Sequence, residues 1–454
     1  MRKAKVIATL GPSTTSYETT KEVAKYVDGF RINFSHATEE ERTIYIKNIR
    51  RAEDELNKPL AVIGDLQGPS IRFGKIKEKS FKVDDQFYIS LNGEVPLSSE
   101  VFFNDVSEKD LLLIDDGKVQ LKVLRKYDDR IEVKALSDGC LTPGKAIVIK
   151  GKEYSLPAIS PKDEQDIKWC IDNEVDYIAM SYVKKKSDVV ALRRFLEENG
   201  GSSIKVMCKI ETNAGFKNLK EILEECDMVI VARGDLGLHF SIEEIPFLQS
   251  KIIEESLRNG KQAIVATQLL TSMVESVVPT RSEAVDVYNA IKEGTSGFLL
   301  TNETSIGKHP VETVMFLNKI ILLAEKELVN LNIFEAKPQS LSDKFSYGLV
   351  KLSEALESTI VIYTKSGNTA FRIAKFRPKI RVYSSSANKR VVRQINLLWN
   401  FEPFLVEEKD YENGLENAIS LLVKRNKLKP GDSVILTYGL ADRPHHIIRL
   451  IRLQ

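Results

Sequence analysis

Seven short apolar segments of the sequence each end in side chains that could do chemistry. The first ends in cationic, amide, hydroxyl and imidazole groups, and the later ones end in carboxylates, an ammonium group and further hydroxyls. In chain order the residues at these ends are Arg31, Asn33, Ser35 and His36; Asp65 and Arg72; Ser181; Lys209 and Glu211; Arg233, Gly234 and Asp235; Thr267 and Gln268; and Asn302 and Glu303. Gathered at one edge of a sheet, they would form a single polar site.

The charges in this set point to a metal ion and a phosphoryl group. Glu211 and Asp235 follow neighbouring segments and could face one hard cation, because Mg²⁺ is usually held by a few carboxylates together with substrate oxygens. Arg31, Arg72 and Lys209 add three positive charges, more than one small carboxylate substrate needs. They suit a phosphoryl group, whose negative charge spreads over its oxygens in the transition state.

The turn from Arg233 to Asp235 adds backbone donors, since Gly234 lacks a Cβ that would keep a ligand away. The P-loop pattern G-x-x-x-x-G-K-S/T is absent, and so are H-E-x-x-H and G-x-S-x-G. The residues alone therefore favour metal-assisted phosphoryl chemistry.

Eight strand-helix units are expected to position these residues. Short β-branched runs, each followed by an amphipathic stretch, predict strands at 5–9, 30–34, 60–66, 177–181, 204–210, 228–233, 263–268 and 297–301. Eight parallel units close naturally into a (β/α)₈ barrel, whose chemistry lies at the carboxyl ends of the strands. A doubly wound open sheet remains the alternative on this pattern.

Two further units interrupt and follow the barrel, which predicts three domains. The barrel is expected at 1–69 and 157–332, interrupted by a small β-rich domain at 70–156 that is well placed to act as a lid. A C-terminal α/β domain is expected at 333–454, with strands at 359–363, 380–383 and 433–437. His445 and His446 are expected to begin a solvated helix there.

Composition limits the partners. The 66 Lys and Arg residues nearly cancel the 64 Asp and Glu residues, for a net charge of +2, so no bulk basic footprint for nucleic acid exists. No apolar run approaches the roughly 18 to 20 residues that cross a bilayer. The four cysteines form no C-x-x-C pair. We expect a cytoplasmic protein that binds neither nucleic acid nor a membrane.

A series of motifs resembles the pyruvate kinase family. In chain order they read ATLGPS, FRINFSH, GDLQGPSIR, KIET, VARGDLG, ATQLLTSM, PTRSEAVDV and NETSIGKHP. The resemblance implies phosphoryl transfer from phosphoenolpyruvate to ADP, giving pyruvate and ATP in the last step of glycolysis, with Mg²⁺ or Mn²⁺. It also implies a homotetramer, and a branch without the helical N-terminal domain of many animal members.

The resemblance assigns roles to single residues. Lys209 would lie at the transferring phosphoryl group, and Glu211 and Asp235 would hold the divalent ion. The amides of Gly234 and Asp235, with Thr267, would bind the substrate carboxylate, and Thr267 would join the water relay that protonates the enolpyruvate carbon. The remaining contacts would be Arg31 and Arg72 to phosphate, Ser181 to substrate, and Asn33, His36, Arg72 and Lys145 to the nucleotide.

Two regions depart from the commonest family pattern. Potassium-dependent members use an Asn, a Ser, an Asp and a backbone carbonyl as ligands, and these positions are Asn33, Ser35, Asp65 and Leu66 here. The neighbouring D-T-K-G-P-E motif reads DLQGPS, with Ser70 replacing the Glu, which resembles the potassium-independent branch. Potassium is therefore expected to be unnecessary.

The C-terminal loop TKSGNT follows a strand and precedes a helical segment, where backbone N–H groups and hydroxyls could cradle a phosphate. In the family, the matching loop grips the phosphate of an allosteric sugar phosphate or nucleotide. The candidate effector residues are Thr364, Ser366, Gly367, Asn368 and Thr369.

Two other functions stay open from the sequence. A Mg²⁺-dependent barrel aldolase or lyase acting on pyruvate would share the Glu211 and Asp235 pair but would not need the inserted domain or Lys145. A non-catalytic metabolite sensor would have no need for Thr267. ADP dependence separates the kinase from the aldolase.

Overall fold

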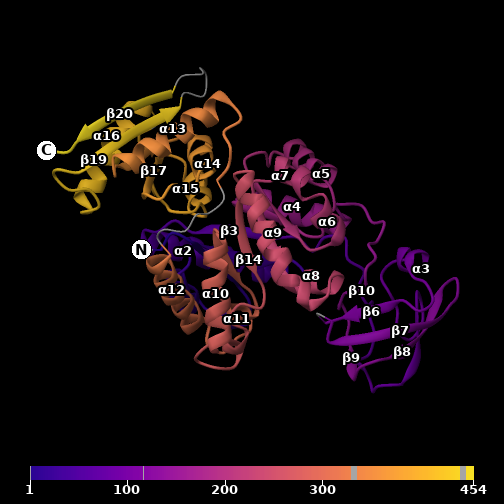
Figure 1. Cartoon of the computed structure of the whole chain (residues 1–454). Coiled ribbons are helices and arrows are strands. Elements are labelled where there is room, and N and C mark those ends of the chain that lie inside the picture. The colour runs from indigo at the N-terminus through magenta and orange to yellow at the C-terminus, as the bar shows by residue number, and fades with distance from the viewer. Residues whose placement is uncertain (1, 116, 329–334, 409, 440–445) are drawn as a thin grey trace.

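The computed structural model describes residues 2–115, 117–328, 335–408, 410–439 and 446–454. A central barrel carries an inserted β-rich unit on one side and a C-terminal α/β unit on another (Figure 1). The expected barrel boundaries at 69/70 and 156/157 stay predictions, and the one at 332/333 lies outside the described residues. No described helix is long and apolar enough to cross a membrane.

The barrel closes, which excludes the open-sheet alternative. Its described strands follow the order β1-β15-β14-β13-β12-β11-β3-β2, and each neighbouring pair is parallel. Most of these strands are buried on both faces, as parallel strands covered by helices must be. The strands are β1 (Lys5–Thr9), β2 (Gly29–Asn33), β3 (Ala61–Asp65), β11 (Tyr177–Met180), β12 (Lys205–Ile210), β13 (Met228–Ala232), β14 (Gln262–Ala266) and β15 (Gly297–Leu300).

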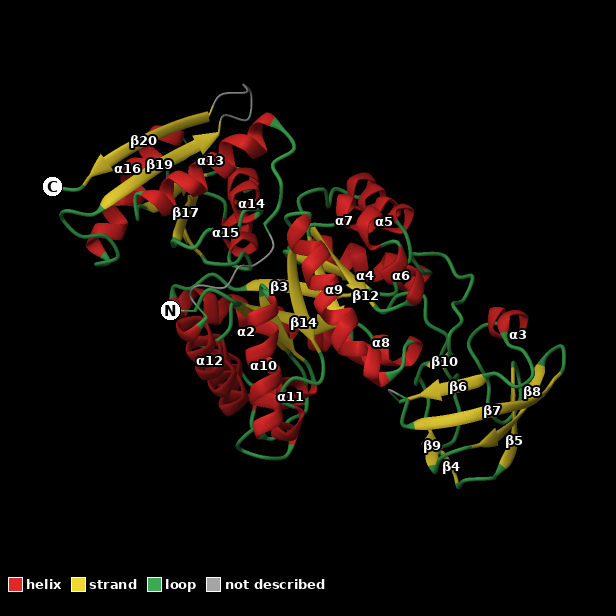
Figure 2. Cartoon of the chain, in the orientation of Figure 1, coloured by secondary structure: helices red, strands yellow, loops and turns green. Residues whose placement is uncertain are grey.

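Helices surround this barrel (Figure 2). Several begin with side-chain caps that the sequence specifies, such as Thr38, whose hydroxyl accepts the N–H of Glu41 while the Glu41 carboxylate accepts the N–H of Thr38. The helices are α1 (Tyr17–Ala24), α2 (Glu39–Leu56), α4 (Pro161–Asp172), α5 (Lys186–Glu198), α6 (Asn213–Lys217), α7 (Leu219–Glu225), α8 (Arg233–His239), α9 (Ile245–Arg258), α10 (Arg281–Glu293), α11 (Asn302–Ser305) and α12 (Pro310–Glu327).

The inserted unit lies between β3 and α4 and has its own apolar core. Its main sheet is antiparallel, in the order β10-β6-β7-β8-β5, with a separate β4-β9 pair. Its elements are β4 (Lys79–Phe81), β5 (Gln86–Ser90), α3 (Val101–Asp105), β6 (Leu111–Ile114), β7 (Val119–Lys126), β8 (Arg130–Ala135), β9 (Gly139–Leu141) and β10 (Ile147–Ile149).

The C-terminal unit has a sheet in the order β18-β17-β16-β19-β20, in which only β20 runs antiparallel among the described strands. Two of its strands, β18 and β20, escaped the sequence analysis. His446 begins β20 and stacks on Phe345, so the expected helix start is wrong, and His445 lies outside the described residues. The elements are α13 (Leu341–Ala355), β16 (Thr359–Tyr363), α14 (Asn368–Ala374), β17 (Val382–Ser386), α15 (Lys389–Ile395), β18 (Phe401–Leu405), α16 (Tyr411–Lys424), β19 (Ser433–Gly439) and β20 (His446–Arg452).

The C-terminal unit closes the amino-terminal end of the barrel. The Lys5 ammonium, which is buried, donates to the Phe401 carbonyl at 2.7 Å. The Gln394 side-chain amide donates to the carbonyls of Asp176 and Ser203, just before two barrel strands. Residues inside the barrel and residues of the C-terminal sheet also form one apolar core cluster. The two units therefore share a core.

Burial of Lys5 predicts a pH effect on stability. Desolvation lowers the Lys5 pKa to about 8, with Asp28 partly opposing the shift. Between that value and the ordinary lysine pKa the unfolded chain holds the extra proton, so wild-type stability should rise as pH rises through this window. In Lys5→Met this rise should shrink by up to about 3 kcal/mol, since each pKa unit is worth about 1.4 kcal/mol. Urea unfolding at pH 7.5 to 10.5 measures this pH dependence of stability. Lys25→Met, at an exposed lysine, is the matched control. Identical pH profiles for Lys5→Met and wild type would contradict the prediction.

Candidate active site

The predicted polar residues meet at the carboxyl ends of the barrel strands, away from the end that the C-terminal unit closes. Figure 2 shows the inserted unit and the C-terminal unit on different sides of the barrel. Parallel pairing brings these residues together, because every strand of a closed parallel barrel ends at the same rim.

Lys209, at the end of β12, lies at the centre of the charges. Its Nζ is 2.8 Å from Glu211 Oε1 and 3.5 Å from Asp65 Oδ1, and it donates to Ser181 Oγ at 2.9 Å. Burial alone would lower the Lys209 pKa, but the nearby carboxylates of Asp65, Glu211 and Asp235 outweigh burial and raise it. Lys209 is therefore a fixed positive charge and not a base.

Asp65 holds two of the cations in place. Its side chain is 3% exposed, and its Oδ2 accepts from Arg31 Nε at 2.6 Å with Arg31 Nη2 also at 2.6 Å. Burial would raise the Asp65 pKa, yet Lys209 and Arg31 together hold it below its ordinary value. The sequence placed Asp65 at a strand end, and the family resemblance gave it only a monovalent-cation position, so its place between Arg31 and Lys209 went unrecognised.

Glu211 offers an oxygen that fits a metal ion. It is fully buried, and its Oε2 accepts the Tyr182 N–H at 2.6 Å. Within the described part of the chain, its Oε1 accepts no hydrogen bond and has only the ion pair with Lys209. Asp235 lies near enough to act electrostatically on the same lysine and on Tyr182.

These two carboxylates suit a hard divalent ion. No group of three or more His, Cys, Asp or Glu side chains that could hold a metal occurs among the described residues. A two-carboxylate site with a buried, poorly satisfied oxygen fits an ion that takes its other ligands from substrate and water.

Thr267 and Gly234 lie beside each other because β13 and β14 pair in register at Ala232 and Ala266, just before them. The Gly234 N–H donates to Thr267 Oγ1 at 2.8 Å. Thr267 has a φ of +68°, which is rare for a β-branched residue. The expected carboxylate-binding residues Gly234, Asp235 and Thr267 are thus brought together at one rim.

Arg72 connects the barrel to the inserted unit. Its Nη1 donates to the Gly144 carbonyl at 2.8 Å, its Nε to Ser70 Oγ at 3.1 Å and its Nη2 to Ser35 Oγ at 3.4 Å. Lys145 follows Gly144, with its Nζ 3.5 Å from Asp115 Oδ2. The inserted unit therefore places a cation next to the rim.

The side chains of Asn33 and His36 complete this edge of the rim. Asn33 Oδ1 accepts the Ser35 N–H at 3.1 Å. His36 is partly exposed, and its partial burial together with the charges of Arg72 and Arg31 lowers its pKa. His36 therefore stays neutral to lower pH and remains open to a ligand.

Glu303 has a supporting role at the rim, and the predicted effector residues lie in another part of the molecule. Glu303, at the rim, accepts the N–H groups of Leu269 and Leu270 through Oε1 and that of Thr301 through Oε2, so it fixes loops. The effector candidates Thr364, Ser366, Gly367, Asn368 and Thr369 lie in the C-terminal unit, away from this rim.

Comparison with known proteins agrees with this geometry. The family model for the pyruvate kinase barrel domain matches residues 1–314, and the one for the pyruvate kinase alpha/beta domain matches 344–446. Pyruvate kinases of Pyrobaculum aerophilum and Aeropyrum pernix are 38% and 35% identical, over 98% and 99% of this chain and 95% and 99% of theirs.

Solved structures agree as well. The crystal structure of the Pyrobaculum aerophilum pyruvate kinase has a TM-score of 0.89 at 37% identity, covering 99% of both chains. That of a Cryptosporidium parvum pyruvate kinase has a TM-score of 0.90 at 28% identity, covering 100% of this chain and 96% of that one. From its barrel rim to its C-terminal sheet, the chain therefore belongs to the pyruvate kinase family of phosphotransferases.

Proposed function

We propose that this chain transfers the phosphoryl group of phosphoenolpyruvate to ADP, using a divalent ion held by Glu211 and Asp235. The observation that carries the proposal is the protonated Lys209, fixed 2.8 Å from a buried carboxylate oxygen that lacks a hydrogen bond. Family membership and this arrangement favour the kinase over the aldolase and the sensor.

The cations at the rim suit the transferring group. Lys209 and Arg31 are held by Asp65 with their charges towards one region, and preorganised charges of this kind stabilise a phosphoryl transition state without reorganising. When bound, Mg²⁺ or Mn²⁺ would neutralise charge on the phosphoryl and carboxylate oxygens of the substrate. Ser181, which donates to Leu66 O at 2.8 Å and accepts from Lys209, orients the lysine and borders the substrate.

The other half of the rim would bind the enolpyruvate and protonate it. The N–H groups of Gly234 and Asp235 lie in the first turn of helix α8 and would bind the substrate carboxylate together with Thr267, whose Oγ1 would share the Gly234 N–H that it already accepts. The Thr267 hydroxyl, through water, would deliver a proton to the enolate carbon. Protonation to pyruvate removes the enolate and so drives transfer towards ATP.

The nucleotide side is formed by Asn33, His36, Arg72 and Lys145. Arg72 already joins the barrel to the Gly144 carbonyl of the inserted unit, which supports a lid that closes over ADP. Lys145 would exchange its exposed partner Asp115 for a nucleotide phosphate. A partly exposed ion pair of this kind costs little to break.

Potassium is not required in this proposal, because the oxygens at the expected ligand positions already have proton donors. Ser35 Oγ accepts from Arg72, the Leu66 carbonyl accepts from Ser181, and Asp65 is held by Arg31 and Lys209. Ser70, where potassium-dependent members carry a Glu, also accepts from Arg72. Fixed guanidinium and ammonium charges thus lie against oxygens that would otherwise bind a monovalent ion.

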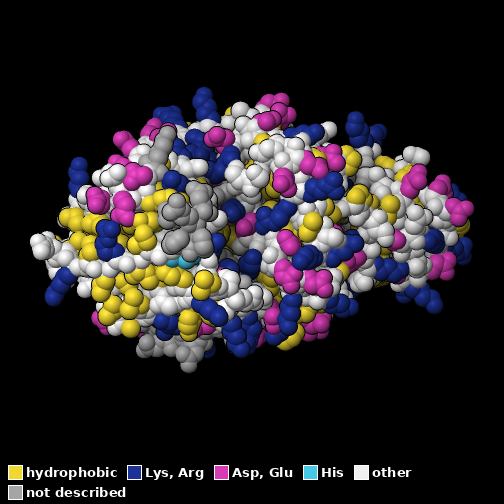
Figure 3. Space-filling model, turned by 90° about the horizontal axis from the view of Figure 1, so that it is seen from above, with side chains coloured by type: hydrophobic (Ala, Val, Ile, Leu, Met, Phe, Trp, Pro, Cys, Tyr) yellow, Lys and Arg dark blue, Asp and Glu magenta, His cyan; other side chains and the backbone are white. Residues whose placement is uncertain are grey.

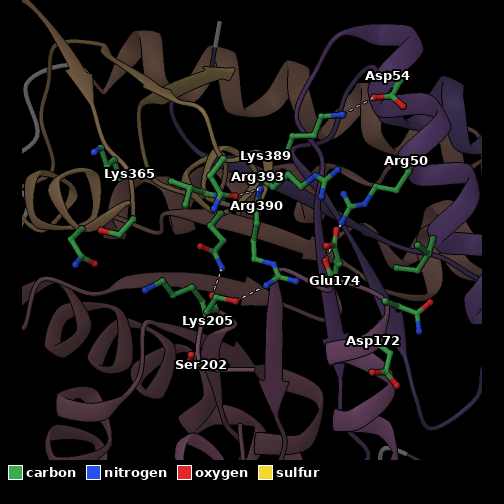
Figure 4. A pocket seen from close by; sticks show the side chains of 18 residues that line it. Arg50, Asp54, Asp172, Glu174, Ser202, Lys205, Lys365, Lys389, Arg390 and Arg393 are labelled. Carbon is green, nitrogen blue, oxygen red and sulfur yellow. Dashed lines mark hydrogen bonds and ion pairs between the residues drawn. The ribbon is translucent and has the colours of Figure 1, made fainter. Parts of the chain in front are cut away.

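A phosphorylated effector is proposed at a cavity of about 1000 Å³ between the C-terminal unit and the barrel (Figure 4). This volume lies at the upper end of the range usual for ligand sites. Ser366 and Asn368 of the effector loop line it, and the loop is set by the Gly367 N–H, which donates to Thr364 Oγ1 at 3.0 Å. The cavity is lined by more basic than acidic side chains. The basic ones are Arg50, Lys205, Lys365, Lys389, Arg390 and Arg393, and the acidic ones are Asp54, Asp172 and Glu174.

A homotetramer is proposed from exposed apolar side chains. On the barrel, Ile242 and Phe247 are 85% and 64% exposed, and on the C-terminal unit Leu341 and Leu450 are 78% and 53% exposed. Figure 3 shows apolar side chains gathered over the C-terminal unit. Such patches are typical of subunit interfaces, and sedimentation velocity measures the number of subunits.

Loss of the central lysine should abolish turnover. In Lys209→Met we expect kcat to fall by about 100- to 1000-fold or more, because a preorganised charge at the transition state is lost. A coupled lactate dehydrogenase assay with phosphoenolpyruvate, ADP and Mg²⁺ measures it. Lys5→Met, a buried lysine at the other end of the barrel, is the matched control and should retain activity; a Lys209→Met enzyme within about fivefold of wild type would refute the assigned role.

Potassium dependence is tested at constant ionic strength. Replacing tetramethylammonium chloride with KCl should change kcat/KM by less than about tenfold, which corresponds to about 1.4 kcal/mol of transition-state stabilisation. Ser70→Glu should lower activity without potassium and recover part of it with KCl, since the new carboxylate would compete for Arg72. A larger rise in the wild type would show that the oxygens still bind potassium.

The effector loop is tested by Ser366→Ala combined with Thr369→Ala. Sugar phosphates and nucleoside monophosphates that shift the phosphoenolpyruvate half-saturation of the wild type should shift it at least about tenfold less potently in the variant, because hydroxyl contacts to a phosphate are lost. Ser420→Ala, on an outer helix, is the control. If the double variant responds to every effector as the wild type does, the loop is not the phosphate site.

A further inference from the structure

Two successive residues at the end of β14 have a left-handed backbone. Thr267 has a φ of +68° and Gln268 a φ of +51°, and neither is glycine. Such conformations cost free energy and persist only where surrounding contacts hold them. The contacts that hold these two residues should therefore matter for the Thr267 hydroxyl.

Arg233 supplies those contacts. Its Nη2 donates to the Thr267 and Gln268 carbonyls, at 2.7 Å each, and its Nε donates to the Thr267 carbonyl at 3.1 Å. The Arg233 side chain is 8% exposed, so these bonds are shielded from water. Both strained peptides are thereby tied to one planar group.

The guanidinium is itself fixed from two helices. Its Nη1 donates to both carboxylate oxygens of Asp286 on α10, at 2.9 and 2.8 Å, and to Gln249 Oε1 on α9 at 3.3 Å. Charge-assisted bonds of this kind are short and directional. Arg233 therefore cannot swing away without losing several partners.

The same turn also fixes the hydroxyl. Gly234, the next residue after Arg233, donates its N–H to Thr267 Oγ1 at 2.8 Å. One dipeptide thus holds Thr267 at both its carbonyl and its side chain. Without Arg233, the two carbonyls would lose their donors, the backbone would relax towards negative φ, and the hydroxyl would leave its place.

We propose that Arg233 is a positioning residue for protonation of the enolpyruvate intermediate, acting by holding Thr267 in its left-handed turn. The inference rests on the proposed role of Thr267. In that step the relay proton forms a C–H bond at C3 while the enolate oxygen becomes the carbonyl oxygen of pyruvate. Phosphoryl transfer, which depends on Lys209 and Arg31, needs Arg233 much less.

The test compares the two half-reactions in Arg233→Lys and Arg233→Met. Protonation is followed as exchange of pyruvate methyl hydrogens with D₂O by proton NMR, and phosphoryl transfer as ATP formation by luciferase. In Arg233→Met, exchange should fall about tenfold or more beyond any fall in ATP formation, as expected for a misplaced proton relay. Arg233→Lys, which keeps the charge but loses the fork, should fall between Arg233→Met and wild type.

A rescue variant separates positioning from a general structural role. Glycine adopts positive φ readily, so adding Gln268→Gly to Arg233→Met should recover exchange by about fivefold or more. Arg2→Met removes another buried arginine, ion-paired to Asp28 at 2.7 Å at the closed end of the barrel. It should leave the ratio of the two half-reactions unchanged.

The other outcomes are decisive. If Thr267→Val loses exchange while both Arg233 variants keep it, Thr267 keeps its role and the positioning proposal fails. If Thr267→Val keeps exchange, the proposed role of Thr267 fails and the inference with it. Equal loss of both half-reactions in Arg233→Lys, without recovery by Gln268→Gly, would also overturn the proposal. If Arg233→Met does not fold, the proposal is tested with Arg233→Lys, alone and in combination with Gln268→Gly.

Discussion

A protonated lysine that is only 14% exposed at the rim of a barrel must be neutralised by neighbours, and Lys209 imposes this requirement on the strands around it. Removing a charge from water costs several kcal/mol unless partners compensate for it. The partners come from different strands: Glu211 follows β12, Ser181 follows β11 and Asp65 ends β3. Asp65 in turn needs Arg31 of β2 to compensate its own burial. The order β12-β11-β3-β2 places these four strands side by side, so the charge cluster and the strand register depend on each other.

The parts of this arrangement that depend on local pattern could be predicted from the sequence. Each barrel strand is a short apolar run with polar residues at its end, and this pattern located Lys209, Glu211 and Asp235. Which side chains touch across strands depends on register and closure, which no local run encodes. For that reason the place of Asp65 between two cations, and the bonds of Arg233 to the neighbouring strand end, became visible only in three dimensions.

The strands missed in the C-terminal unit have similar causes. Pro403 lies within β18, and proline argues against a strand because its backbone nitrogen donates no hydrogen bond. The β20 segment carries two arginines and begins beside a histidine pair, which resembles a solvated helix start. Antiparallel pairing with β19 makes this segment a strand, and β19 is not part of the short segment whose pattern was interpreted.

The hydrogen bond from Lys5 to the Phe401 carbonyl joins residues 396 positions apart. A ribosome adds roughly 5 to 20 residues each second, so the first strand waits about 20 to 80 seconds before its partner exists. The closing strand β15, and the C-terminal residues that complete the shared apolar core, are also made late. Until those parts are made, the early strands have an unpaired edge and uncovered apolar faces, which makes the nascent chain prone to aggregation.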